Sequence, residues 1–319
     1  MVETGASLRV LFFGTPEFAV PTLQALLDSR HQVVGVVTQP DRPRGRGQKV
    51  TDAPVKMLAL QAGLPVAQPE TLKDASVIDH LAAFNSDIGV VAAFGKILSE
   101  RMLSLPRGGM VNVHASLLPR FRGAAPVHRA VIAGEPETGL TIMRVVKALD
   151  AGPMLARITR PIGPDETSED VERDLARLGA RLLITTLDDW SAGRVVEEAQ
   201  DDRLATYAHR LTKGDGIVDW DWPAERVHNL IRGLHPWPHA FSFLNGRRLI
   251  LRRSSWAPES LVDAAPGTVL QADGDRLRIA TGSGVLNLLQ IQPEGKRPLS
   301  VREFLSGHPV HAGERFERQ

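Results

Sequence analysis

Leu8-Arg9-Val10-Leu11-Phe12-Phe13-Gly14-Thr15-Pro16 is the stretch of this sequence that decides the fold. The apolar run over residues 10–13 predicts a strand buried on both faces, as strands of parallel sheets are. Gly14 ends the strand, and Pro16 suits the first turn of a following helix. The stretch therefore predicts a strand–turn–helix unit, the repeating element of an α/β fold.

Further strands are expected at residues 32–38, 88–93 and 110–114, with a helical segment before the second of them. Strands that alternate with helices predict a Rossmann-like, mostly parallel sheet. The turn at residues 14–17 reads Gly-Thr-Pro-Glu and lacks the Gly-x-Gly-x-x-Gly that a dinucleotide pyrophosphate needs. A nicotinamide-dependent dehydrogenase, the rival from another enzyme class, therefore loses its main support.

The composition narrows the class of protein. With 319 residues the chain is long enough for two domains, and a net charge of +1 provides no global field for nucleic acid. The absence of cysteine excludes disulfides, thiolate catalysis and a cysteine-based zinc site. No signal-peptide pattern and no apolar run of membrane-spanning length is visible. We expect a soluble cytoplasmic protein outside the membrane, and a monomer by default.

The C-terminal third changes character. Short apolar runs are separated by Asn245-Gly246, Asp273-Gly274 and Gly282-Ser283-Gly284, a pattern typical of a small antiparallel barrel. Between the two regions the chain turns polar. We predict an α/β domain over 1–192, a linker over 193–211 and a small antiparallel β-barrel over 212–319.

Polar residues follow the apolar end of the strand at residues 110–111. Asn112 and His114 are two apart, so on a continuing strand they share one face at the carboxyl end, where ligands of open α/β sheets bind. Asp150 lies further on. An amide donor for an oxyanion, an imidazole that moves a proton and a carboxylate that orients it suit acyl transfer without a covalent intermediate. The alternative is a polar turn with a structural histidine, which is the commoner case for an isolated histidine.

The pattern Asn-x-His-x-Ser-Leu-Leu-Pro-x-x-Arg-Gly-x-x-Pro from residue 112, followed by Leu-Asp-x-Gly at 149–152, resembles the active-site pattern of the folate-dependent formyltransferases. Residues 14–18, 38–43, 141–143 and 236–238 extend the resemblance over essentially the whole chain, and it is strongest to members that act on initiator tRNA. Ala115 departs from the pattern, because glycine is frequent there, and adds a methyl group beside the strand.

The resemblance implies formyl transfer from 10-formyltetrahydrofolate, as co-substrate, to the α-amine of methionyl-initiator tRNA for translation initiation. It implies Asn112, His114 and Asp150 as catalytic residues. No metal is required, because the formyl group is already activated on N10. The expected folate contacts are Ser116, Leu117, Leu118 and Pro119, with the pterin at Phe94, Gly95, Lys96, Ile97 and Leu98.

A basic loop interrupts the pattern after the second strand. Proline, glycine and four cations, Arg42, Arg44, Arg46 and Lys49, predict a mobile loop that cannot bury itself. It is either a solvated surface or a contact to the phosphates of a nucleic acid. The resemblance implies an insertion that engages the acceptor end of tRNA.

Arginines also gather on one strand of the expected barrel. Arg247, Arg248, Arg252 and Arg253 are explained equally well by an edge strand protected by charge and by a surface that faces RNA. The resemblance implies that the barrel is OB-like and contacts tRNA, with Arg247 and Arg248 as the expected contacts.

Three rival functions remain open. A glycinamide ribonucleotide formyltransferase would lack the C-terminal barrel, and a sugar-amine formyltransferase would not need the basic loop. A tRNA-binding module without catalysis would explain the loop and the barrel, but not the set of Asn112, His114 and Asp150.

Overall fold

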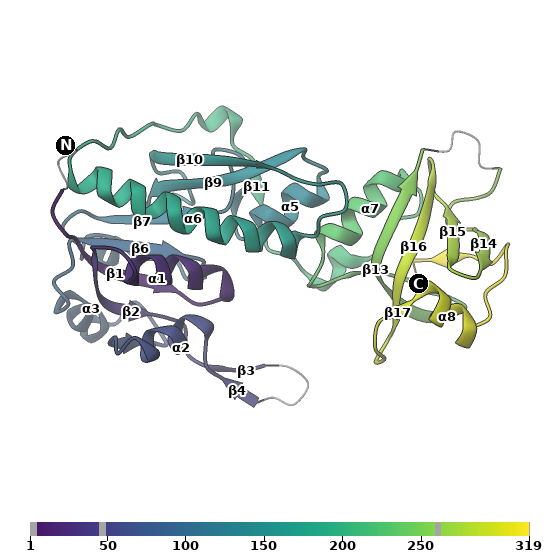
Figure 1. Cartoon of the computed structure of the whole chain (residues 1–319), viewed down its shortest axis with the longest axis horizontal. Coiled ribbons are helices and arrows are strands. Elements are labelled where there is room, and N and C mark those ends of the chain that lie inside the picture. The colour runs from purple at the N-terminus through teal and green to yellow at the C-terminus, as the bar shows by residue number, and fades with distance from the viewer. Residues whose placement is uncertain (1–4, 45–48, 259–262, 319) are drawn as a thin grey trace. The chain divides into compact units, whose positions relative to one another are not determined.

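The computed structural model of the chain describes residues 5–44, 49–258 and 263–318. Its contacts divide the chain into two compact units, each assembled from three segments (Figure 1). The first unit holds Met1–Pro126, Thr138–Arg160 and Glu172–Ala208, and the second holds Val127–Glu137, Pro161–Val171 and His209–Gln319. No helix within these described ranges has both the length and the apolar character needed to cross a bilayer.

The first unit is built on a sheet with the strand order β10-β9-β7-β6-β1-β2-β5. From β5 across to β7 the strands pair in parallel, and β9 joins β7 antiparallel. The predicted Rossmann-like, mostly parallel sheet is confirmed. The strands are β1 (Arg9–Gly14), β2 (Gln32–Val37), β5 (Val66–Ala67), β6 (Ile88–Ala92), β7 (Met110–His114), β9 (Glu137–Arg144) and β10 (Met154–Pro161).

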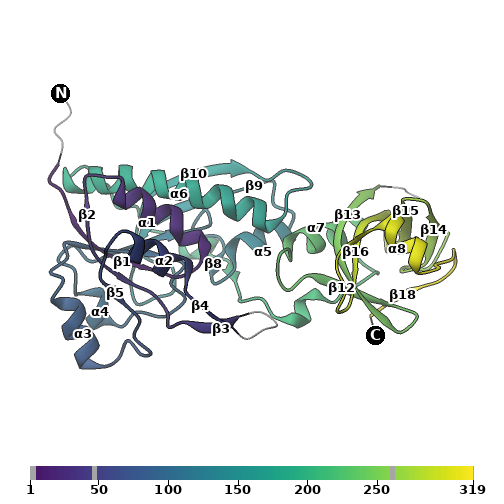
Figure 2. The ribbon, with the colours of Figure 1, turned by 60° about the horizontal axis from the view of Figure 1, so that its bottom comes forward.

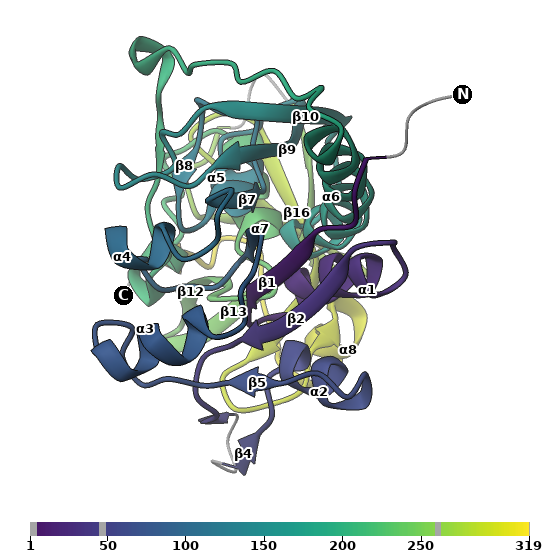
Figure 3. The same cartoon turned by 90° about the vertical axis from the view of Figure 1, so that its left-hand side faces the viewer.

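Helices cover both faces of this sheet (Figure 3). On one face lie α1 (Val20–Leu27), α2 (Pro54–Gln61) and α6 (Ser168–Ser191), and on the other lie α3 (Ala75–Ala82) and α4 (Glu100–Leu103). Val10, Leu11, Phe12 and Phe13 are consequently all 0% exposed, as the apolar run predicted. A further short helix, α5 (Pro126–Ile132), follows the polar stretch after β7.

The basic loop begins and ends in regular structure that the sequence did not predict. Its described ends form an antiparallel hairpin of β3 (Arg42–Arg44) and β4 (Lys49–Thr51), which stands away from the main sheet (Figure 2). Pro43 lies opposite Val50 in this ladder. A proline is tolerated in a two-stranded ribbon, where its missing N–H can face outward, so its presence did not exclude a strand.

The segment expected as a linker is ordered over much of its length. It contains η2 (Asp202–Leu204) and β11 (Tyr207–Ala208), and β11 pairs in parallel with β8 (Arg122–Gly123). Glu198 also bridges to Met154. Up to Ala208 this segment therefore belongs to the first unit by its contacts.

The second unit holds an antiparallel sheet with the order β14-β15-β16-β13-β12-β18, and β17 pairs with β16. The Asn245-Gly246 turn has φ values of 52° and 71°, as a tight hairpin requires. The sheet curls into an open half-barrel, so the predicted OB-like architecture is confirmed. Its elements are α7 (Ala224–Gly233), β12 (Ala240–Leu244), β13 (Arg247–Ala257), β14 (Val269–Asp273), β15 (Arg276–Ala280), β16 (Val285–Pro293), β17 (Leu299–Ser300), α8 (Val301–Gly307) and β18 (Phe316–Glu317).

The arginine-rich strand is interior to this sheet. β13 pairs with β12 on one side and β16 on the other, so the interpretation as a charged edge strand is wrong. Leu249 and Leu251 of this strand are buried, at 3% and 0% exposure. Arg248 and Arg252, which alternate with these leucines, therefore lie on the opposite face of a central strand.

Candidate active site

β7 carries Asn112 and His114 to the carboxyl end of the sheet. Asn112 pairs with Val91 of β6 and Met143 of β9, and the alternation of a strand places His114 on the same face. His114 is buried, at 5% exposure, while Asn112 is half-buried. Among the described residues the Asn112 carboxamide has no hydrogen-bond partner, so its donor is available to a ligand.

Asp150 comes from a turn between β9 and β10. Its φ is 47°, in the left-handed region that aspartate tolerates better than most residues. Its Oδ2 accepts a hydrogen bond of 2.8 Å from the Gly123 amide and lies 3.7 Å from His114 Nδ1. That separation exceeds a direct hydrogen bond and leaves the pair to be joined by a water molecule or a substrate atom.

The other ring nitrogen of His114 has a backbone partner. Nε2 lies 3.1 Å from the Phe121 carbonyl oxygen. Because a carbonyl only accepts, Nε2 carries a proton in this arrangement, and Nδ1 is the nitrogen that faces Asp150. The structure thus brings His114 and Asp150 together, with Asn112 two residues away on the same strand.

The turn after β7 contains the first expected folate run. The Thr141 hydroxyl donates to the Ser116 carbonyl at 2.7 Å and accepts from the Leu118 amide at 3.2 Å. Ser116 is fully buried, and Leu118, at 2% exposure, packs with Met143 and Met154. Leu117 and Pro119 are half-buried, so they are the two members with side-chain surface to offer a ligand.

The second expected folate run follows β6. Phe94 packs edge-on against Phe13 in the core, and Leu98 belongs to the same cluster. Lys96 donates to the carbonyls of Pro69 and Glu70 at 2.9 Å. Ile97 is 91% exposed and Gly95 is exposed with φ 77°, so these two present open surface.

Several residues around Asn112, His114 and Asp150 were not expected from the sequence. Arg122 and Gly123 form the Arg-Gly pair of the pattern quoted above, but the sequence did not indicate what either residue does. Phe121 contacts His114 through its backbone carbonyl, and Gln200, in the polar segment after α6, donates to the Asp150 carbonyl. No sequence pattern indicated either contact.

The residues expected to contact tRNA are placed less completely. The backbones of Arg42, Arg44 and Lys49 pair within the hairpin, and Arg46 lies outside the described residues. Arg247 is exposed at the start of β13. Arg248 donates to Glu294 at 2.8 Å and stacks over Phe241 with 3.9 Å from its guanidinium carbon to the ring centre, so part of its charge is already neutralised.

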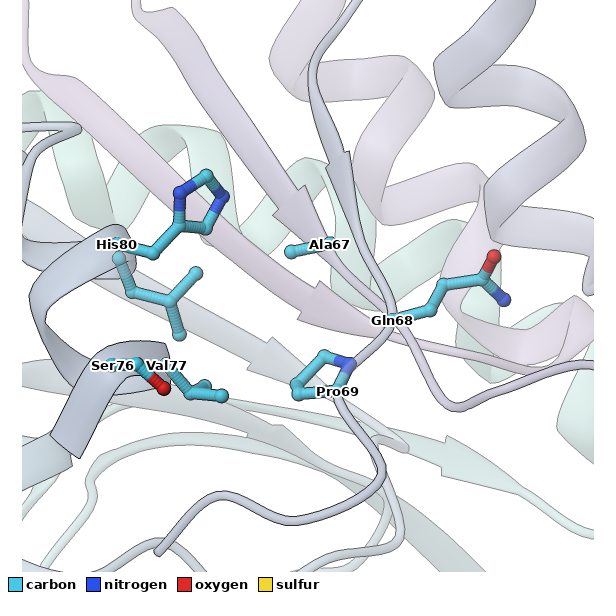
Figure 4. Close-up of a pocket in the computed structure, with 7 residues that line it drawn as sticks. Ala67, Gln68, Pro69, Ser76, Val77 and His80 are labelled. Carbon is cyan, nitrogen blue, oxygen red and sulfur yellow. The ribbon is translucent and has the colours of Figure 1, made fainter. Parts of the chain in front are cut away.

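A cavity of about 330 Å³ lies along β5 and α3 (Figure 4). It shares no residue with the expected catalytic residues or the expected folate runs. Its lining is Ala67, Gln68, Pro69, Ser76, Val77, His80 and Leu81. The Gln68 Nε2 amide donates to the Gln39 carbonyl and to Asp41, both at 3.0 Å. Within the described ranges, no group of three or more His, Asp or Glu residues could hold a metal ion.

Comparisons with known proteins agree across nearly the whole chain. The family model described as formyl transferase matches residues 8–187, and that of the formyl transferase C-terminal domain matches residues 210–309. A methionyl-tRNA formyltransferase of Trichlorobacter lovleyi is 47% identical over 305 residues, covering 96% of both chains. That of Heliobacterium modesticaldum is 46% identical over 316 residues, covering 97% of this chain and 100% of its own.

Solved structures share the fold. WlaRD, a sugar 3N-formyl transferase, aligns with a TM-score of 0.67 at 18% identity, over 92% of this chain and 100% of its own.

Proposed function

We propose that this chain, which belongs to the formyl transferase family, uses Asn112, His114 and Asp150 to transfer a formyl group from 10-formyltetrahydrofolate to the α-amine of methionyl-initiator tRNA. The observation that carries this function is the match to methionyl-tRNA formyltransferases over 96% of the chain at up to 47% identity. The separation of 3.7 Å between His114 Nδ1 and Asp150 Oδ2 supports the assignment of the residues.

In the proposed reaction the free amine attacks the formyl carbon. A C–N bond forms, and the carbonyl oxygen becomes an oxyanion on a tetrahedral carbon. Asn112 donates its amide N–H to that oxyanion. The intermediate then collapses, the bond from carbon to N10 breaks, and N10 leaves with a proton as tetrahydrofolate.

His114 and Asp150 handle the proton that the attacking amine loses. Asp150 accepts from Gly123, which aims Oδ2 toward Nδ1. A water molecule or the amine itself completes the contact between the two groups and relays the proton toward N10. A protonated His114 adds a charge-assisted donor beside the Asn112 amide.

The remaining parts of the chain serve the large acceptor. We assign residues 1–192 to catalysis, 193–211 to the connection and 212–319 to tRNA binding. Arg42, Arg44, Arg46 and Lys49 are the proposed phosphate contacts of the first part, and Arg247 and Arg248 those of the last. We place the protein in the cytoplasm, where charged initiator tRNA is used, and expect it to act as a monomer.

The decisive experiment offers several acceptors to one enzyme preparation. 10-Formyltetrahydrofolate labelled in the formyl group is mixed with methionyl-initiator tRNA, methionyl-elongator tRNA, glycinamide ribonucleotide or an amino sugar nucleotide. Label should appear on the initiator tRNA. Label on the sugar or on the ribonucleotide would instead assign a small-amine formyltransferase. tRNA binding without any transfer would leave only a binding module.

A further inference from the structure

Gln200 connects the polar segment after α6 to the turn that carries Asp150. Its Nε2 donates to the backbone carbonyls of Asp150, at 2.9 Å, and Gly152, at 2.7 Å. Both bonds lie within the first unit. One amide group therefore holds two carbonyls of the same short turn, and one of these belongs to a residue of the catalytic set.

Arg122 sets the orientation of that amide. Gln200 Oε1 accepts from Arg122 Nε at 3.1 Å and from Nη2 at 2.8 Å. Since a guanidinium can only donate, the oxygen must face Arg122 and the NH₂ group must face the two carbonyls. Arg122 is itself 3% exposed, and its Nη2 also reaches Asp202 at 2.7 Å, so the guanidinium has little freedom to turn.

The turn at Asp150 needs such support because its backbone is unfavourable. Asp150 has φ 47°, and a residue other than glycine in this region is held there by its surroundings. The turn is also tight, since a Cβ on Gly152 would lie 2.0 Å from the Arg144 carbonyl oxygen. Without Gln200, the carbonyls of Asp150 and Gly152 would lose this hydrogen-bond donor.

The same short strand holds Asp150 in two ways. The Gly123 amide of β8 binds the Asp150 carboxylate, and the neighbouring Arg122 side chain, acting through Gln200, holds the Asp150 backbone. Two neighbouring residues of β8 therefore hold both the carboxylate and the backbone of Asp150. Shifting the backbone would move Oδ2 relative to His114 Nδ1, from which it stands 3.7 Å.

We propose that Gln200, oriented by Arg122, is the positioning residue of Asp150 in formyl transfer. This inference rests on the proposed function. Gln200 touches no reacting atom; it keeps the carboxylate at the distance and angle at which a proton can pass between Asp150 and His114. A displacement of about 1 Å can cost about a hundredfold in rate.

The test uses a substitution that separates the two halves of the amide. Gln200→Glu keeps an acceptor for Arg122 but replaces the donor by an oxygen that repels the carbonyls of Asp150 and Gly152. We expect kcat for formylation of methionyl-initiator tRNA to fall about ten- to a hundredfold, with the KM for folate within about twofold of wild type. Gln200→Met, which removes donor and acceptor at similar size, should lose kcat to the same extent and replaces the first variant if that one does not fold.

A matched control lies in the same segment. Arg203→Gln breaks an ion pair with Asp201 on an exposed guanidinium, 89% accessible, and should leave kcat and KM at wild-type values. Wild-type kcat in Gln200→Glu, with label still passing to tRNA in the parent chain, would overturn the positioning role and leave the function standing. A parent chain that transfers no label would overturn both.

A double-mutant cycle separates positioning from general stability. If Gln200 acts through the Asp150 carboxylate, adding Gln200→Glu to Asp150→Asn should lower the residual kcat by no more than about twofold, because coupled residues are not additive. Full multiplication of the two losses would show that Gln200 acts elsewhere, and would sink the proposal.

Discussion

Main-chain groups place the side chains of the candidate active site. The His114 ring is oriented by the Phe121 carbonyl, and the Asp150 carboxylate is held by the Gly123 amide. Asn112 differs from both, because its donor has no partner among the described residues. The set is therefore preorganised at two of its positions and open at the third, as a site that binds an oxyanion should be.

The first prediction concerns these three residues. Asn112→Ala, His114→Ala and Asp150→Ala should each lower kcat for formyl transfer at least about a hundredfold, the usual loss when an oxyanion donor or an acid–base group is removed. Steady-state assays with charged initiator tRNA measure the loss, and circular dichroism checks the fold. A folded variant with near wild-type kcat would remove its residue from the mechanism.

The second prediction concerns Thr141, which both donates to Ser116 and accepts from Leu118. Thr141→Val keeps the shape but leaves a buried carbonyl and a buried amide unpaired. We expect the free energy of unfolding to fall by about 1–3 kcal/mol, and the KM for folate to rise, because the turn at 116–119 loses its support.

Urea unfolding and steady-state kinetics test this prediction. Thr185→Val is the matched control, since its exposed hydroxyl binds only a carbonyl of its own helix. An unchanged folate KM in a destabilised Thr141→Val protein would separate this turn from the folate site.

Among the elements, the β3–β4 hairpin is where the sequence and the structure differ most. Charge and proline suggested an unstructured loop, yet Arg42 pairs with Thr51 and Arg44 with Lys49. Residues 45–48, which include Arg46, lie outside the described part of the chain.

The third prediction belongs to this hairpin. If Arg42, Arg44, Arg46 and Lys49 meet phosphates, each alanine variant should lower the slope of log affinity against log salt by roughly 0.7–0.9. Arg46→Ala should impair kcat/KM for charged tRNA more than Arg44→Ala, because it lies between two glycines where the backbone can approach RNA closely.

A salt series of kcat/KM values for each variant makes the measurement. Lys73→Ala, which removes an exposed cation elsewhere in the first unit, is the control and should leave the slope unchanged. If all four variants keep the wild-type salt slope, the hairpin is only a solvated surface. tRNA binding would then depend on the second unit.

At the scale of the whole molecule, two histidines of the second unit have strongly lowered pKa values. The pKa values of His128 and His239 are lowered from 6.5 to about 4, chiefly by burial, with Arg129 adding to the effect for the first and Arg252 for the second. Between pH 6.5 and 4 the unfolded chain binds protons that the folded chain does not. The contribution of these residues is therefore complete above pH 6.5 and is lost as the pH falls toward 4.

The fourth prediction follows from this loss of stability at low pH. The free energy of unfolding, measured in urea at pH 7.5 and at pH 5, should drop on acidification, and a His128→Gln, His239→Gln protein should show a smaller drop. His80→Gln, a change at an exposed histidine of the first unit, is the control. An equal drop in parent and double variant would assign the acid sensitivity to other groups.

The sequence by itself determined the architecture of both units, because apolar runs and turn residues are recognised from residues that are neighbours in the chain. The run Val10–Phe13 indicated a strand covered on both faces, and Asn245-Gly246 indicated a hairpin whose φ values the structure bears out. The spacing of Asn112 and His114 placed them on one face of one strand. Each of these inferences needed only residues that are close together in the chain.

Tertiary structure alone decided the rest, because the deciding partners are distant in sequence or carry no residue identity. β13 became a central strand through pairing with β16, which no local pattern specifies. The linker segment belongs with the first unit up to Ala208 because β11 pairs with β8, more than eighty residues earlier. The orientation of Asp150 depends on the Gly123 amide and on Gln200, fifty residues away. A backbone amide is the same at nearly every position, so the sequence does not reveal which one binds the carboxylate.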